Sequence, residues 1–408
     1  MQEPIPFQSS PFLPNAERPD VHVQWGLGPY ENTRTALSMI DLSAAHNKRI
    51  LLKPNIGRMA DANSGVVTNP QVVAAAIDAF REAGAEVAIG ESPIVGINTM
   101  EAYEQSGLAE VARERNCPLI DMDERKPLVT EIPDGKAIQS LKLCADVQDF
   151  DLLVSIPVMK MHMHTVATLS IKNMKGCLWR RSKVELHMLP PTPGFEQEKS
   201  LNVAIVDMAT ILRPHLAIID GTVGMEGLGP SAGDAKPMGA IVVGADPFAA
   251  DAVACQLMGI TAAEVPHLRM SAERGLGTTD LDQIQISPEN WRDATTPFAR
   301  VPDNLSIQFP DTTILDNQSC SACQSTLLLF LKRYGKEMFQ YIPCDLPIQI
   351  AIGKGHDNLP DNTILIGNCT RAHKDNRTFI SGCPPVASAI MNHIKEGQSE
   401  TPSDSTDS

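Results

Sequence analysis

The sequence predicts an α/β protein with a mostly parallel sheet flanked by helices, followed by a smaller C-terminal α+β module. Short apolar runs alternate with amphipathic helical segments along most of the chain, which is typical of a parallel sheet. A separate pattern begins near residue 311, where a pair of cysteines precedes its own helix and strands. The chain has 408 residues, of which 43% are hydrophobic, so we expect two or three domains with full-sized cores.

The first elements have clear local signals. The apolar run at residues 49–53 predicts a buried strand. Asn69 followed by Pro70 predicts the start of a helix, and Gly84 predicts its end. The next expected elements are a strand and one continuous helix, over residues 86–90 and 100–115.

The remaining elements continue this alternation. Further strands are expected at residues 118–121, 152–156, 216–220 and 240–244, and a helix over residues 247–258. In the C-terminal module we expect a helix at 326–339, strands at 348–353 and 363–367, and a helix after Pro385. The predicted organisation is a disordered arm, an α/β domain, a linker rich in Pro, Asp and Thr, a cysteine-rich module and a disordered acidic tail, over residues 1–20, 21–275, 276–310, 311–396 and 397–408.

The composition argues against two classes of partner. The formal net charge of −15 disfavours sequence-general binding of nucleic acid and of anionic membrane surfaces. No stretch reaches the length of a membrane span, and the first residues lack the basic-then-apolar pattern of a signal peptide. We therefore expect a cytoplasmic protein with reduced thiols. Four of the nine cysteines lie singly and are expected to be small core residues: Cys117, Cys144, Cys177 and Cys255.

Polar residues follow the carboxyl ends of five predicted strands. Ligands of parallel α/β sheets bind beyond these ends. A single charged residue there is normally solvated, but five ends with charges beside Gly or Pro indicate a crevice into which side chains are aimed. The five are Lys53-Pro54-Asn55, Gly90-Glu91-Ser92, the run from Ile156 to His162, Asp220-Gly221 with Glu226 downstream, and Asp246-Pro247.

Lysines and histidines near these ends can together hold a carboxylate or a phosphate. The group comprises Lys53, Lys160, His162, Lys172 and Lys175, with the amide of Asn173 between the last two. Neither a P-loop nor a dinucleotide glycine fingerprint is present, so the sequence predicts no nucleotide cofactor.

Three side chains are candidates for proton transfer. Asp220 and Glu226 are the best carboxylates, although loop capping explains either one equally well. His187 is a further acid or base, or else an ordinary loop residue. His162 and His164 would share one face of a strand as a metal pair, but no third ligand stands nearby in the sequence.

Cys320, Cys323, Cys369 and Cys383 are the candidate metal ligands. A close pair and two single thiolates can enclose one metal centre, and the spacing alone suits structural zinc as well as an iron–sulfur cluster. The proline after Cys383 also occurs in ferredoxin ligand runs, which favours iron–sulfur. Four thiolates would leave no iron open, whereas three would leave one iron free to act as a Lewis acid. The alternative ligands are Cys344 and His373.

The order of motifs over residues 21–275 resembles the family called domain of unknown function 362. These motifs are Lys-Pro-Asn, Thr-Asn-Pro, Gly-Glu-Ser-Pro, Pro-x-x-Lys-x-His, Lys-Asn-x-x-Gly, Asp-Gly, Glu-Gly-x-Gly-Pro and Asp-Pro-x-x-x-Asp. The matching residues are Lys53, Asn55, Thr68, Glu91, Lys160, His162, Lys172, Asn173, Asp220, Glu226, Asp246 and Asp251. Members of that family often carry iron–sulfur ligands, so the resemblance implies an appended iron–sulfur module, with [4Fe–4S] the favoured type.

The leading hypothesis is an iron–sulfur redox enzyme that acts on a small or medium anionic substrate. The expected catalytic residues are Lys53, Lys160, His162, Asp220, Glu226 and His187, and the expected substrate-binding residues are Asn55, Thr68, Glu91, Lys172, Asn173 and Lys175. A ferredoxin is a possible redox partner. The alternatives are a non-redox lyase or isomerase with a structural or Lewis-acid cluster, and a non-catalytic carrier of electrons or clusters.

Overall fold

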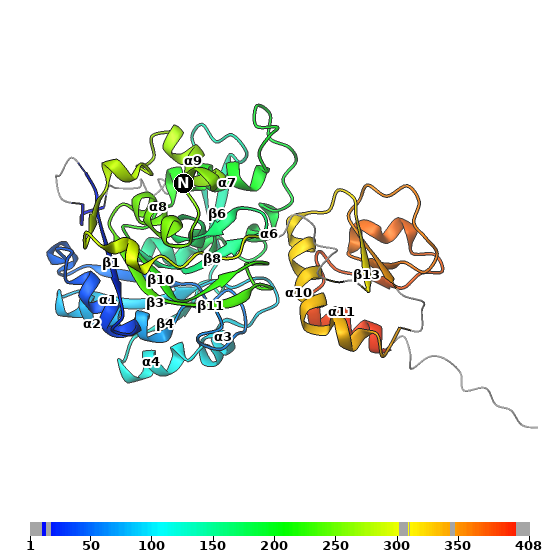
Figure 1. Cartoon of the computed structure of the whole chain (residues 1–408), viewed down its shortest axis with the longest axis horizontal. Coiled ribbons are helices and arrows are strands. Elements are labelled where there is room, and N and C mark those ends of the chain that lie inside the picture. The colour runs from blue at the N-terminus through cyan, green and yellow to red at the C-terminus, as the bar shows by residue number, and fades with distance from the viewer. Residues whose placement is uncertain (1–9, 14–17, 302–308, 310, 343–346, 397–408) are drawn as a thin grey trace, which may run out of the picture. The chain divides into compact units, whose positions relative to one another are not determined.

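The computed structural model describes residues 10–13, 18–301, 309, 311–342 and 347–396, and divides into two compact units (Figure 1). The first unit is Met1–Val301 and the second is Pro302–Ser408. The predicted acidic tail lies outside the described residues, as does most of the predicted N-terminal arm.

The first unit is built on one ten-stranded sheet with the strand order β12-β1-β11-β10-β7-β2-β3-β4. The last two of the ten strands lie off this path: β8 pairs with β10, and β9 pairs with β8. The strands are β1 (Asp20–Trp25), β2 (Arg49–Pro54), β3 (Glu86–Glu91), β4 (Leu119–Asp121), β7 (Leu152–Ile156), β8 (Val158–His162), β9 (Val166–Thr168), β10 (Leu216–Glu226), β11 (Asp234–Gly244) and β12 (Gln285–Ser287). A separate hairpin pairs β5 (Leu128–Glu131) with β6 (Ser140–Leu143).

Most strand pairs in this sheet are parallel. β2 pairs in parallel with β3 and β7, β3 with β4, and β10 with β7 and β8. β11 is the main exception, because it runs antiparallel to both β1 and β10. The predicted class, a mostly parallel α/β sheet flanked by helices, is therefore confirmed.

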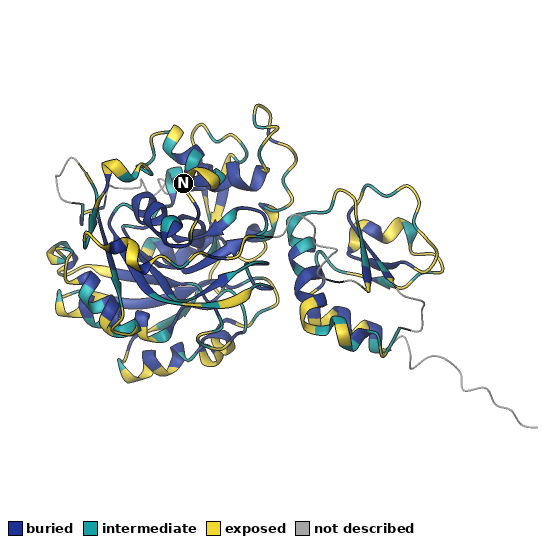
Figure 2. Cartoon of the chain, in the orientation of Figure 1, coloured by how far each residue is buried: buried dark blue, intermediate teal, exposed yellow. Residues whose placement is uncertain are grey.

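Helices cover both faces of the sheet, and the strands alternate between two cores (Figure 2). Along β2, Leu51 packs into one core, whereas Ile50 and Leu52 pack into the other, as a two-residue repeat requires. The first core also contains α7 (Ser200–Ile211) and α8 (Pro247–Leu257). The second contains α1 (Pro29–Leu37), α2 (Pro70–Glu82), α3 (Thr99–Gln105) and α4 (Leu108–Glu114).

The predicted start of α2 is correct, but the prediction of one helix over residues 100–115 is wrong. Asn69 caps α2 by accepting a hydrogen bond from the Gln71 amide, and Pro70 is its first residue. Between α3 and α4, Gly107 adopts a left-handed conformation with φ of 78°. A residue at this angle cannot continue a right-handed helix, so the segment breaks into two short helices.

Part of the expected linker is ordered within the first unit. Residues 281–294 form two 3₁₀ turns and β12, which pairs in parallel with β1. Trp291 is buried beside this strand and joins the first core. At the other end of the chain, Phe12 packs against Phe80 with ring centroids 6.2 Å apart.

The second unit contains a four-stranded parallel sheet in the order β13-β14-β15-β16. Its strands are β13 (Thr312–Asp316), β14 (Ile348–Ile352), β15 (Ile364–Ile366) and β16 (Phe379–Ile380), and its long helices are α10 (Ser321–Met338) and α11 (Ala387–Glu396). The helix α10 begins before the predicted residue 326, so that it starts directly after Cys320. No helix in the described part of either unit is both long and apolar enough to cross a bilayer.

Candidate functional site

The carboxyl ends of β2 and β3 are joined by a buried ion pair between Lys53 and Glu91. The Lys53 Nζ lies 2.8 Å from Glu91 Oε2, and each side chain is only 1% exposed. Lys53 also donates to Asn173 Oδ1 at 3.2 Å, on the short helix α5 (Ser170–Asn173). Glu91 accepts two backbone N–H groups as well, from Ile56 and Ser92. The Lys53 charge is therefore matched inside the protein.

The amide of Asn55 connects this ion pair to Lys160 on β8. Lys160 donates to Asn55 Oδ1 at 2.5 Å and to the Val66 carbonyl, while Asn55 Nδ2 donates to Asn173 Oδ1 at 3.2 Å. The hydroxyl of Thr68 accepts from the Asn55 N–H at 2.7 Å, which fixes the backbone here. The predicted residues at the ends of β2, β3 and β8 are thus brought together.

Gly176 lies against the ion pair and allows its close approach to the following turn. A Cβ at this position would lie 2.2 Å from Lys53 Nζ and 2.6 Å from Glu91 Oε1, which is far inside van der Waals contact. Only a residue without a side chain fits here while the pair keeps its geometry.

Gly176→Ala is expected to destabilise the protein by about 1–3 kcal/mol, because the new methyl group must displace Lys53 from its ion pair with Glu91. Gly57→Ala is the matched control, since a Cβ there meets nothing within 4 Å; we expect a change within about 0.5 kcal/mol. Chemical denaturation of both variants measures the difference. Equal stability of the two variants would contradict this account of Gly176.

Beside this matched pair lies a second group, which we call the cationic cluster: Lys160, Lys172, Lys175, His162, His187 and His267. Lys175 Nζ lies 2.7 Å from His187 Nε2, and Lys172 donates to the Thr168 hydroxyl at 3.1 Å. His162 Nδ1 accepts from the His164 N–H at 3.0 Å, so a neutral His162 ring carries its proton on Nε2. Among the ion pairs between described residues, none joins a carboxylate to Lys160, Lys172 or Lys175.

The lysines of the cluster have lowered pKa values because they are buried among other cations. Burial, with the charges of Lys175 and Lys160, holds the pKa of Lys172 well below the ordinary lysine value. Burial lowers the pKa of Lys160 to about 7, and the charge of Arg58 adds to the effect. Burial and the charge of Lys183 lower the pKa of Lys175 to about 7. These amines can therefore exchange protons near neutral pH.

The histidines of the cluster are held neutral for the same reasons. Burial and the charge of Lys172 place the pKa of His162 well below the usual value. Burial and the charges of Lys175 and Lys172 have the same effect on the pKa of His187. Lys175 and His187 are both partly exposed, so they mark the side on which the cluster meets solvent.

Of the two carboxylates predicted for proton transfer, Asp220 lies at the site and Glu226 does not. Asp220 is buried near Lys160, where it accepts the N–H groups of Asn69 and Thr222 at 2.8 Å each, and burial raises its pKa. Glu226 instead forms an ion pair with Lys236 at 3.2 Å and accepts the N–H of Ala299. It lies beyond the cluster because β10 continues past Asp220 to Glu226.

Asp246 and Asp251 serve as helix caps in the structure. Asp246 follows β11, which runs antiparallel to β10, so it lies at the end of the sheet opposite to the carboxyl ends of the parallel strands. There it caps α8. Asp251 accepts the N–H groups of Ser170 and Ile171 and thereby caps α5. Burial raises the pKa of Asp251 to about 7.

Two residues near the site were missed from the sequence: Lys183 and His267. Lys183 donates to the Ser92 hydroxyl and to the Leu178 carbonyl. His267 belongs to α9 (Pro266–Glu273), is 1% exposed, and has a pKa lowered to about 3 by burial and the charge of Lys172. Only its type and its place at a helix start were visible in the sequence, and neither predicts that it faces Lys172.

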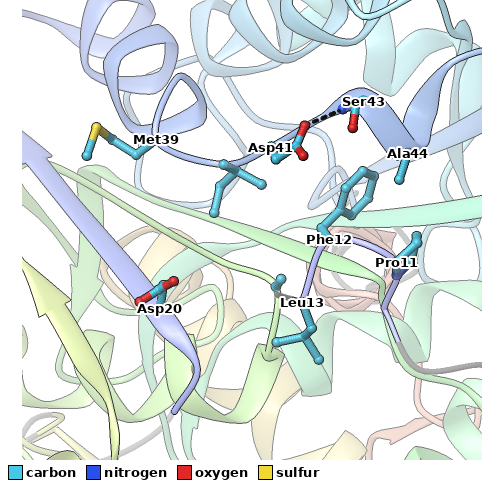
Figure 3. A pocket seen from close by; sticks show the side chains of 10 residues that line it. Pro11, Phe12, Leu13, Asp20, Met39, Asp41, Ser43 and Ala44 are labelled. Carbon is cyan, nitrogen blue, oxygen red and sulfur yellow. Dashed lines mark hydrogen bonds between the residues drawn. The ribbon is translucent and has the colours of Figure 1, made fainter. Parts of the chain in front are cut away.

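A separate pocket of about 260 Å³ lies between residues 10–13 and the stretch 39–44 (Figure 3). Its lining includes Phe12, Leu13 and two carboxylates, Asp20 and Asp41. Asp41 already accepts the Ser43 N–H at 2.9 Å. None of the predicted site residues lines this pocket, and its acidic groups do not suit an anion.

In the second unit, the four predicted cysteine ligands come from two regions that fold together. Cys320 and Cys323 lie at the start of α10, and their side chains are hydrogen-bonded to each other. Cys369 and Cys383 are brought close because the Asn368 N–H donates to the Gly382 carbonyl at 2.8 Å and the Gly382 N–H donates back to Asn368 Oδ1. All four are free thiols.

The local environment favours a thiolate at Cys320. A hydrogen bond with Cys323, together with the backbone N–H groups of the first turn of α10, lowers the pKa of Cys320 to about 6. The pKa of Cys323 is raised by its hydrogen bond with Cys320, by burial, and by the charges of Cys369 and Cys383. Gly367 would place a Cβ 3.6 Å from Cys323 Sγ, so the loop before Cys369 approaches the pair closely.

The four thiols thus influence one another, yet their present arrangement is not a closed metal site. Among the described residues, no three or more His, Cys, Asp or Glu side chains are grouped so that they could hold a metal ion. Cys344, the alternative ligand, lies outside the described residues. His373, the other alternative ligand, donates from Nε2 to the His356 carbonyl oxygen at 3.0 Å.

Comparison with known proteins gives a family and distant structural likenesses. A thylakoid-associated protein of Synechocystis, sll1697, is 28% identical over 251 residues, which is 60% of this chain and 75% of that protein. The lactate racemase apoprotein of Thermoanaerobacterium thermosaccharolyticum gives a TM-score of 0.41 at 13% identity, over 83% of this chain and 70% of that one. A protein of Thermotoga maritima gives 0.32 at 13% identity, over 61% of each chain. The profile of the Domain of unknown function (DUF362) matches residues 50–256, about half of the chain, and the protein belongs to that family.

Proposed function

We propose that this protein is an enzyme that binds a small anionic substrate at the cationic cluster and that its four C-terminal cysteines hold an iron–sulfur cluster. The observation that carries the proposal is the burial of Lys160 and Lys172 beside the partly exposed Lys175, without a carboxylate ion pair to any of the three among the described residues. Buried charges are costly unless they are paired. An anionic ligand would supply the missing charge.

The residues of the cluster have complementary abilities. Lys172 supplies a cation for the anion to contact. The surrounding backbone is fixed by the ion pair of Lys53 with Glu91 and by the hydrogen bond from Asn173 Nδ2 to the Lys53 carbonyl. Lys160 and Lys175 can give or accept a proton near neutral pH, since each has a pKa of about 7. His187, 2.7 Å from Lys175, can relay a proton between that amine and solvent.

The cysteines suit an iron–sulfur cluster in their chemistry. Two thiols come from the start of α10 and two from the segments around Cys369 and Cys383, and the first turn of α10 stabilises a thiolate at Cys320. When bound, a [4Fe–4S] cluster would supply one-electron transfer, which makes a redox reaction the favoured type and a ferredoxin a suitable partner. Structural zinc remains the alternative for the same ligands.

Anaerobic reconstitution with iron and sulfide tests the cysteine assignment. We expect visible absorbance and about four irons per chain, and loss of both in Cys323→Ser and Cys369→Ser. Cys117→Ser is the matched control, because this thiol is buried in the first unit and should leave the spectrum unchanged. A colourless protein that retains one zinc per chain would sink the iron–sulfur assignment.

A non-redox lyase or isomerase is the second candidate, favoured by the two lysines with pKa values of about 7. It predicts that Cys→Ser variants lose stability without losing substrate turnover. A non-catalytic carrier predicts instead that Lys160 and Lys172 can be changed without functional effect. Location in the cytoplasm stays a prediction; the thylakoid association of the Synechocystis relative makes a membrane-fraction assay its direct test.

A further inference from the structure

We infer that the ligand of the cationic cluster carries at least two negative charges on one compact oxyanion group, as a phosphate monoester does, and that Lys172 and His267 contact this group. The inference rests on the proposed anion site and narrows its ligand from carboxylate or phosphate to the phosphate class. It also adds a binding residue, His267, that sequence reasoning did not find.

The first argument is the charge balance of the two halves of the site. One half is matched, because Lys53 and Glu91 form an ion pair 2.8 Å long. The other half contains three lysines on three segments, β8, α5 and the 3₁₀ turn that follows α5. A single carboxylate would balance one of these charges, whereas a dianion would balance two.

The second argument is the central position of Lys172. Its charge acts on His162 of β8, on His187 and on His267 of α9, and it is itself acted on by Lys175 and Lys160. Groups from four parts of the chain therefore lie within electrostatic range of one ammonium group. The hydroxyl of Thr168 is its hydrogen-bond partner, and this neutral group leaves the charge uncompensated.

The third argument is a buried polar atom without a hydrogen-bond partner, on a histidine whose pKa the charge of Lys172 lowers. His267 is 1% exposed, and its Nδ1 has no hydrogen-bond partner among the described residues. Buried ring nitrogens normally find a partner. An oxyanion that contacts Lys172 would offer several acceptor oxygens, and a protonated Nδ1 could donate to one of them.

Carboxylates on the neighbouring elements point to other partners. Asp251 on α8 accepts the N–H groups that begin α5, and Asp207 on α7 pairs with Arg274 at 2.8 Å. Asp220 accepts backbone N–H groups, and it raises the pKa of Lys160 only as a minor influence. Outside the cluster, the titratable and charged groups that act on its residues are Lys53, Arg58, Glu91, His164, Lys183 and Asp220.

Calorimetric titration of the full chain with sulfate, inorganic phosphate and acetate tests the inference. Sulfate stays a dianion and acetate a monoanion between pH 6 and pH 8, so their comparison isolates ligand charge. We expect sulfate and phosphate to bind at least about 10-fold more tightly than acetate. The affinity for sulfate should fall as pH rises through about 7, because Lys160 and Lys175 lose their protons there in the free protein.

Two variants and one control locate the site. Lys172→Met should weaken sulfate binding at least about 100-fold and His267→Phe about 10-fold, whereas acetate binding should change less. Lys126→Met, which removes an exposed lysine of the same unit, should leave both affinities unchanged. Circular dichroism confirms that each variant is folded before titration.

The outcomes separate the inference from the proposal beneath it. Acetate binding as tight as sulfate binding, with an equal loss of both in Lys172→Met, overturns the dianion inference and leaves the anion site standing. Unchanged sulfate binding in His267→Phe overturns the role of His267. Absence of heat with all three anions overturns the anion site and the inference together.

Discussion

Glu91→Leu is expected to lower the free energy of unfolding by about 3–5 kcal/mol, because it leaves the buried Lys53 ammonium without its counter-charge. Glu91 also accepts the N–H groups of Ile56 and Ser92, so the substitution leaves two backbone donors without their hydrogen-bond acceptor. Urea denaturation at neutral pH measures the loss. The effect is large because Lys53 and Glu91 are each 1% exposed and water cannot replace the lost partner.

The double variant Lys53→Met with Glu91→Leu should recover much of that loss, since it removes both charges and leaves an apolar pair of similar size. A surface pair supplies the control. Arg113 and Glu104 lie 2.7 Å apart with 65% and 59% of their side chains exposed, so Glu104→Gln should change stability by no more than about 1 kcal/mol. A double variant less stable than Glu91→Leu alone would refute the ion-pair account.

Lys172→Met is expected to raise the free energy of unfolding, in contrast to Glu91→Leu, and to abolish anion binding. Lys172 is a buried cation among other cations, so its removal relieves desolvation and repulsion at once. We expect the ligand-free protein to gain at least about 1 kcal/mol, or roughly 2 °C or more in Tm. Added sulfate should raise the Tm of the wild type and not that of the variant.

The gain from Lys172→Met should depend on pH in a defined sense. The folded protein holds the pKa of Lys172 well below its unfolded value of about 10.4. Between these two values the unfolded chain binds more protons, so the stability of the wild type rises with pH. The advantage of the variant therefore shrinks as pH rises above the folded pKa of Lys172 and vanishes as pH approaches about 10.4. Thermal scans across this range check the trend, and a variant less stable than the wild type at pH 7 contradicts it.

Local signals in the sequence predicted the elements that depend on local chemistry. The cap at Asn69 and the run that forms β7 were predicted because a capping side chain and a buried apolar run need no distant partner. The ends of β2, β3 and β8 were also predicted to lie together. Parallel strands place their carboxyl ends at one edge of a sheet, and this rule holds for any such fold.

Features that depend on strand direction could not be predicted in the same way. The direction of β11 decides that Asp246 lies at the opposite edge, and no residue near Asp246 encodes it. The length of β10 similarly decides that Glu226 pairs with Lys236 rather than with the cluster. His267 reaches Lys172 only through the packing of α9, which joins parts of the chain almost a hundred residues apart.

The cap that Asp251 gives to α5 connects α8 to the end of the sheet where the cationic cluster lies. The helix α5 has four residues, too few to persist without an anchor, and it carries both Lys172 and Asn173. Its anchor is a carboxylate on α8, a helix that starts at the far edge of the sheet. A substitution that slides α8 along the sheet would consequently move Lys172 without touching it, so inherited changes far from the cluster would alter the anion selectivity that we propose for this site.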